Sequence, residues 1–124
     1  MMDKQQAELI QLRFGLTLKL ILDENKSKAT DNPKKDIIDS YGKLEISSGL
    51  RKATLIDFVS GKSNPSGTTI AAILDALEIT LTDFGKQYDR ITENDVLEYK
   101  KEIEKAKAIR VSKDKIKSKI RKRK

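Results

Sequence analysis

Lysine, arginine, carboxylate and hydroxyl side chains must carry any chemistry of this chain, because its 124 residues include no histidine and no cysteine. That composition excludes nucleophile–histidine mechanisms, thiolate ligands and histidine-bound zinc. Gly61-Lys62-Ser63 has the ending of a phosphate-binding loop, but Ile56 stands where such a loop needs its first glycine. Ser112 and Lys115 have serine–lysine spacing, but they lie in a basic stretch where chance explains it.

The carboxylates do not form an acid–base pair either. Asp23 and Glu24 are adjacent, and Glu102 and Glu104 are two positions apart. Both pairs lie among lysines on expected helix surfaces. General acid–base catalysis needs such groups within reach of a substrate in a cleft. We therefore expect no enzyme activity, no metal site and no cofactor.

Charge divides the chain into two unequal parts. Residues 100–124 hold 13 Lys and Arg against 3 Asp and Glu, a net charge of +10, whereas residues 1–99 hold 13 against 16, a net charge of −3. Two interpretations of the basic part stay open: a solubilising disordered end, or an anchor on nucleic-acid phosphates. If about six of its charges engaged duplex DNA, log affinity would fall with log salt at a slope near −5.

The start of the chain indicates a cytoplasmic protein. The longest mostly apolar stretch, Leu16–Leu22, is far shorter than a membrane span. Asp3 and Glu8 stand where a signal peptide would be basic.

Helix-forming residues and their periodicity predict a first helix over residues 4–25 with two apolar stripes on roughly opposite sides. One stripe consists of Ile10, Phe14, Leu18 and Ile21, and the other of Leu9, Leu12, Leu16 and Leu20. A helix that is apolar on two sides needs two partners. The second stripe could pack on a Val96/Tyr99/Ile103 face of the same chain or on a second copy. We favour a homodimer through Leu9, Leu12, Leu16 and Leu20 and the C-terminal helix.

Turn and cap residues divide the middle of the chain. Residues 25–31 are polar and linker-like, and the next helix starts either at Asn32–Pro33 or at Ser40. Ser47–Gly49 breaks that helix, and Ser60–Gly61 ends the one that follows.

Polar caps predict the later helices. Ser66 follows a loop that contains Pro65 and caps the next helix. Thr80–Asp83 and Thr92–Asp95 both have the form of a capping box. After residue 109 the chain is rich in lysine and arginine, and we interpret residues 110–124 as disordered, or helical only on a partner.

The middle of the chain resembles the lambda-repressor-like, Cro-type (XRE) helix-turn-helix family. The run that carries the resemblance is Leu44-Glu-Ile-Ser-Ser-Gly49-Leu50-Arg-Lys-Ala-Thr-Leu55-Ile-Asp-Phe58-Val-Ser-Gly61-Lys62-Ser-Asn64-Pro65. Phe14–Leu22 is similar to the first helix of the family, and Thr69–Leu77 and Leu81–Phe84 to its fourth and fifth. The sequence departs from the family in its long connection over residues 26–39 and in Arg51, where a Ser or Thr cap is usual. The resemblance implies a five-helix body over about residues 13–88, with Gly49 in the left-handed conformation of the inter-helix turn.

The resemblance also implies a DNA-binding face. Leu50, Leu55 and Phe58 would hold the recognition helix, about residues 51–60, to the body. The positions that would then face the bases of the major groove are Arg51, Lys52, Ala53, Ile56 and Asp57. The positions that would contact phosphate are Tyr41, Lys43, Gly61, Lys62, Ser63 and Asn64, partly through the backbone N–H groups of residues 61–64.

The sequence thus predicts an all-α protein with three parts. Residues 1–90 form a helix-turn-helix DNA-binding domain, residues 91–109 a C-terminal helix for packing or dimerisation, and residues 110–124 a basic tail. The predicted function is a sequence-specific double-stranded-DNA-binding transcriptional regulator, bacterial or phage-like by resemblance, and the sequence does not give the sign of regulation. Two alternatives stay open: a protein-interaction module such as an antitoxin that masks a partner, and a non-specific nucleic-acid binder that acts through the tail.

Overall fold

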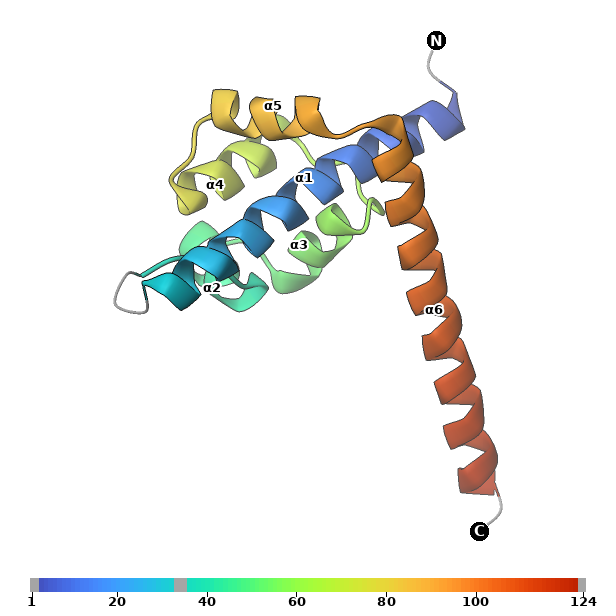
Figure 1. Cartoon of the computed structure of the whole chain (residues 1–124). Coiled ribbons are helices and arrows are strands. Elements are labelled where there is room, and N and C mark those ends of the chain that lie inside the picture. The colour runs from blue at the N-terminus through green and yellow to red at the C-terminus, as the bar shows by residue number, and fades with distance from the viewer. Residues whose placement is uncertain (1–2, 33–35, 123–124) are drawn as a thin grey trace.

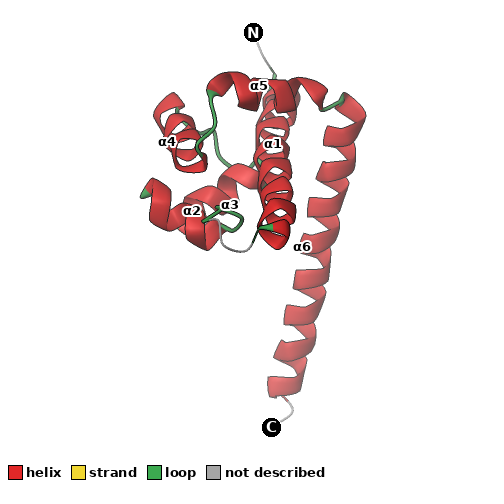
Figure 2. Ribbon diagram, turned by 60° about the vertical axis from the view of Figure 1, so that its left-hand side comes forward, coloured by secondary structure: helices red, strands yellow, loops and turns green. Residues whose placement is uncertain are grey.

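The computed structural model describes residues 3–32 and 36–122, with side chains up to residue 108. These residues form six α-helices and no strand, so the predicted all-α class is confirmed (Figures 1 and 2). The helices are α1 (Lys4–Asp31), α2 (Tyr41–Ser48), α3 (Lys52–Val59), α4 (Gly67–Leu77), α5 (Leu81–Arg90) and α6 (Glu93–Lys122). In this part of the chain, none of the helices is both long and apolar enough to span a membrane.

Helix α1 is the centre of the packing, because α3, α5 and α6 all contact it. Both of its predicted apolar stripes are used within the chain. Leu18 and Ile21 of the first stripe are buried, as are Leu12 and Leu16 of the second. Leu12 and Leu16 are therefore core residues of this chain rather than contacts between two copies, which corrects the predicted dimer interface. Leu9 is half-buried, and Leu20 keeps 40% of its surface exposed.

Helix α1 extends past the predicted end at residue 25. The stretch over residues 26–31, predicted to be a linker, forms its last turns. The reason is that no glycine or proline interrupts the chain between Gly15 and Pro33, and Asn32 ends the helix instead of starting another. Of the two predicted starts for the next helix, Ser40 is the one used: its Oγ accepts the N–H of Lys43 at 3.2 Å.

The predicted caps of the later helices are confirmed. Ser66 Oγ accepts the N–H of Thr69 at the start of α4. Thr80 and Asp83 bond reciprocally, with Thr80 N–H to the carboxylate at 3.2 Å and Asp83 N–H to the hydroxyl at 3.0 Å. Thr92 and Asp95 repeat this arrangement before α6. In both boxes, the backbone hydrogen bond lowers the pKa of the carboxyl group.

Helix α6 begins on α1 and then leaves the body. Val96 and Tyr99 are buried, Lys100 pairs with Glu8 at 3.3 Å, and Lys19 is 3.9 Å from Glu102. The helix continues through its 30 residues, about 45 Å, and so includes residues 110–122, for which the sequence predicts a disordered tail. No glycine or proline follows Gly85 to stop it. In both views α6 leaves α1 and projects beyond the end of the body at which α2 and α3 lie, and Figure 2 shows α1 between α6 and these two helices (Figures 1 and 2).

Candidate functional site

A three-residue turn sets the angle between α2 and α3. Gly49 has a φ of 74°, a left-handed conformation that glycine adopts without strain. Its N–H donates to the carbonyl of Glu45 at 3.0 Å, and Leu50 N–H donates to Ser48 Oγ at 3.2 Å. Buried Leu44 on one side of the turn and buried Leu55 on the other hold both helices in the core. The predicted left-handed glycine is thus confirmed.

The inner side of α3 packs closely against α1. Leu55, Phe58 and Val59 are buried. A Cβ added at Gly15 would lie 2.3 Å from the Val59 carbonyl oxygen and 2.6 Å from that of Phe58. Only a glycine at this position lets the two helix backbones approach so closely.

The end of α3 is also held by α6. The Tyr99 hydroxyl donates a buried 2.6 Å hydrogen bond to the carbonyl oxygen of Val59. Burial is the main reason that the pKa of Tyr99 is raised, so its hydroxyl keeps its proton and stays a donor. The sequence showed Tyr99 only as one member of an apolar stripe, and its tyrosine hydroxyl was the available sign of a polar contact. Tyr99 is a positioning residue for α3.

The outer side of α3 is open. All five residues predicted to face the bases are exposed: Arg51, Lys52, Ala53, Ile56 and Asp57. Ile56 is 44% exposed, and several other large apolar side chains of the described residues are exposed too, among them Ile46 at 85%. Arg51 occupies the N-cap position without a side-chain bond to the helix. Within the described residues, Arg51, Lys52 and Asp57 form no ion pair. We refer to these five residues as the outer face of α3.

The loop after α3 differs from the prediction in its backbone. Gly61 N–H donates to the Phe58 carbonyl at 3.2 Å, and Lys62 N–H donates to the Asp57 carbonyl at 3.0 Å. These two N–H groups close the end of α3 and are not free for a phosphate, contrary to the prediction. The Lys62 side chain is exposed. Gly61 has a φ of 71° and lies against Leu12, so its role is to turn the chain.

The other residues predicted to contact phosphate differ in how exposed their side chains are and in whether those side chains already have partners. Asn64 is exposed and Ser63 is half-buried. Tyr41 is half-buried against the core, and this burial, with a smaller effect of Asp23, raises the pKa of its hydroxyl. Lys43 Nζ lies 3.0 Å from Asp39 Oδ1 and 3.4 Å from the Ile37 carbonyl oxygen. Lys43 is therefore paired within the chain, and Tyr41 packs against the core.

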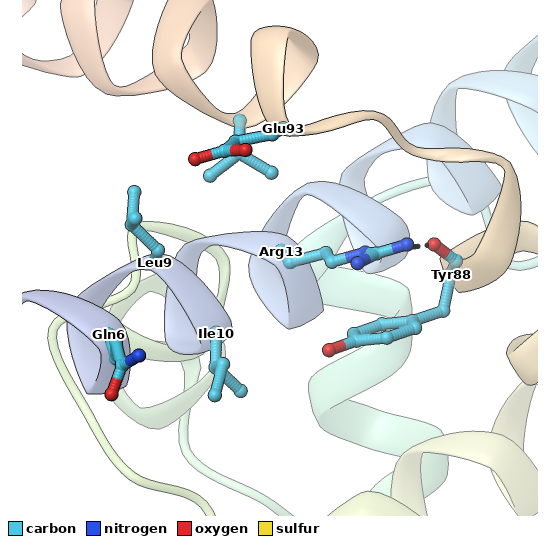
Figure 3. A pocket seen from close by; sticks show the side chains of 7 residues that line it. Gln6, Leu9, Ile10, Arg13, Tyr88 and Glu93 are labelled. Carbon is cyan, nitrogen blue, oxygen red and sulfur yellow. Dashed lines mark hydrogen bonds between the residues drawn. The ribbon is translucent and has the colours of Figure 1, made fainter. Parts of the chain in front are cut away.

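A pocket of about 590 Å³ lies elsewhere, between the start of α1, the end of α5 and the start of α6. Figure 3 shows the Arg13 guanidinium over the Tyr88 ring, 4.3 Å from its centroid, with Nε–H donating to the Tyr88 carbonyl at 3.0 Å. Leu9, Ile10 and Val96 supply apolar lining. The arginine fastens α5 to α1, which is a structural role. Among the described residues, no three acidic side chains come together as a metal site would require.

Comparisons with protein-family models, with curated proteins and with solved structures each found no match to this chain.

Proposed function

We propose that this protein is a sequence-specific DNA-binding transcriptional regulator in which α2, the Gly49 turn and α3 act as a helix-turn-helix. The observation that carries the proposal is the asymmetry of α3. Its inner side is fixed by Gly15 and Tyr99, while its outer face has three charged residues without ion-pair partners in the described chain. A rigid helix with an open polar face is the element that reads bases in the major groove.

The dimensions and residue types of α3 support this proposal. With its side chains an α-helix such as α3 is about 10–12 Å across, close to the width of the major groove. Lys52 and Arg51 can donate to guanine O6 and N7, and Asp57 can accept from cytosine N4. Ala53 and Ile56 offer apolar contact to a thymine methyl group. Lys62, exposed beside the face, suits a phosphate.

Matched substitutions on two helices test the proposal. Lys52→Ala and Asp57→Ala change the outer face of α3, and Lys86→Ala and Asp89→Ala change exposed residues of α5. The probes are a duplex enriched from a random pool by the wild type and a scrambled duplex, compared by fluorescence anisotropy. Loss of a base contact costs about 1–3 kcal/mol, so Lys52→Ala should weaken the enriched duplex by about 5- to 150-fold.

The comparison between the helices decides the outcome. We expect the α5 variants to bind both duplexes as the wild type does, and the α3 variants to lose preference for the enriched one. Equal losses on both helices would contradict the proposal. Equal binding of all duplexes by the wild type would instead favour non-specific binding through the basic end, and retention of a protein partner by every variant without DNA preference would favour an interaction module.

A further inference from the structure

The last part of α6 is the most strongly charged element of the chain. Its distal segment, residues 109–122, holds 7 Lys and Arg against 1 Asp and has no aromatic residue. The preceding turns add three exposed lysines, Lys101, Lys105 and Lys107. A continuous helix with this charge presents a dense positive potential, which attracts a polyanion.

The first turns of α6 are attached both to α3 and to α1, the helix on which α3 packs. Tyr99 bonds to Val59 at the end of α3, and Lys100 pairs with Glu8 of α1. The distal segment is therefore tied by one helix to the recognition helix instead of by a flexible linker. It also projects past the end of the body where α2 and α3 lie (Figures 1 and 2). A charge held in this way loses little conformational freedom when it binds beside α3.

We propose that the distal segment of α6 binds the phosphate backbone of the duplex whose bases α3 reads. This inference rests on the proposed function for the identity of the duplex. Fourteen helical residues are about 21 Å long, and a duplex of that length carries about a dozen phosphates on its two strands together, more than the seven cations of the segment can neutralise. The absence of aromatic residues from this segment speaks against stacking on single strands.

Residues 1–99 carry a net charge of −3, which opposes DNA binding and which a basic segment can offset. A net negative body is repelled by DNA, and base contacts alone must overcome that repulsion. The distal segment, with a net charge of +6 from 7 Lys and Arg and 1 Asp, attracts phosphate whatever the base sequence, so it raises affinity without changing base preference.

The test compares two full-length double variants that remove the same charge. Lys113→Gln/Lys117→Gln alters two positions of the distal segment that are four residues apart and therefore share one face of the helix. Lys4→Gln/Lys86→Gln alters exposed positions on the first turn of α1 and on α5. Glutamine keeps helix propensity close to that of lysine, and circular dichroism checks that both variants fold. The probes are the enriched and the scrambled duplex, titrated from 50 to 300 mM KCl.

If both lysines engage phosphate, the slope of log affinity against log salt should become shallower by about 1.8 in the distal variant. At 150 mM salt this slope change corresponds to about 30-fold weaker binding, on both duplexes alike. The control variant should keep the wild-type slope. An unchanged slope in the distal variant, or an equal change in both variants, would overturn the inference.

This result is separable from the proposed function. Lys52→Ala tests base preference, and the distal variant tests the salt slope. A slope change without any base preference would leave the anchor standing and refute readout by α3. Base preference with an unchanged salt slope would support readout by α3 and refute the phosphate anchor.

Discussion

Replacement of Gly15 by alanine probes the contact on which the position of α3 depends. The added Cβ would lie 2.3 Å from the Val59 carbonyl oxygen and 2.8 Å from the Val59 carbonyl carbon. Both are backbone atoms, so no side-chain rotation can relieve the clash. Helix α3 must move away from α1, and buried Phe58 and Val59 must repack with it.

The expected magnitude is the balance of two opposing effects. Overpacking of a core costs about 1–3 kcal/mol, and contact with backbone places Gly15 at the upper end of that range. Alanine is favoured over glycine in a helix interior by about 1 kcal/mol. The net expectation is a loss of about 2 kcal/mol. Gly85 in α5 is the matched control, because a Cβ there meets nothing within 4 Å of the described structure and should stabilise the protein by about 1 kcal/mol.

Thermal unfolding followed by circular dichroism at 222 nm measures both variants. For a chain of 124 residues, 1 kcal/mol corresponds to about 4 °C in Tm. Gly15→Ala should therefore lower Tm by about 8 °C and Gly85→Ala should raise it by about 4 °C. A Gly15→Ala protein as stable as the Gly85→Ala protein would refute the close α1–α3 contact.

Three further changes address single interactions. Tyr99→Phe removes the buried donor to the Val59 carbonyl, and urea denaturation should show a loss of about 1–3 kcal/mol, whereas no loss would mean that this carbonyl has another partner. Glu78 ends α4 with a φ of 59°, so Glu78→Gly should stabilise by about 1 kcal/mol in the same assay, and destabilisation would contradict the strained backbone. The backbone hydrogen bond from Thr80 lowers the pKa of Asp83 below its usual 3.8, so its stabilisation is present above that pH and is lost as the pH falls through the lowered pKa. The Tm advantage of the wild type over Asp83→Asn at pH 6 should therefore shrink below about pH 4, and a constant difference would contradict it.

Local signals in the sequence predicted much of the fold. Thr80 with Asp83 and Thr92 with Asp95 are three residues apart, so each pair forms its box without help from the rest of the chain. Gly49 has the same local character. Helical periodicity also predicts the exposure of the outer face of α3. Leu55 and Phe58 fall on the side that packs in the core, so the residues on the opposite side face solvent.

Long-range contacts were beyond prediction from the sequence. Tyr99 and Val59 are 40 positions apart, and only the packing of α6 on α1 brings them together. The apolar stripe of Leu12 and Leu16 was compatible with a partner in the same chain or in a second copy, and periodicity cannot distinguish these. Polar and charged composition predicts a linker over residues 26–31 and a disordered tail from residue 110, but lysine, arginine and alanine are good helix formers, and α1 and α6 continue through these stretches.

Selection of bound sites from a random duplex pool tests the central claim most directly. The full-length wild type is compared with the Lys52→Ala and Asp57→Ala variants at 300 mM KCl, where salt weakens the contribution of the basic region. Readout by the outer face of α3 predicts a short enriched motif whose preferred bases change in each variant. Absence of a motif, or one motif shared unchanged by all three proteins, would contradict it.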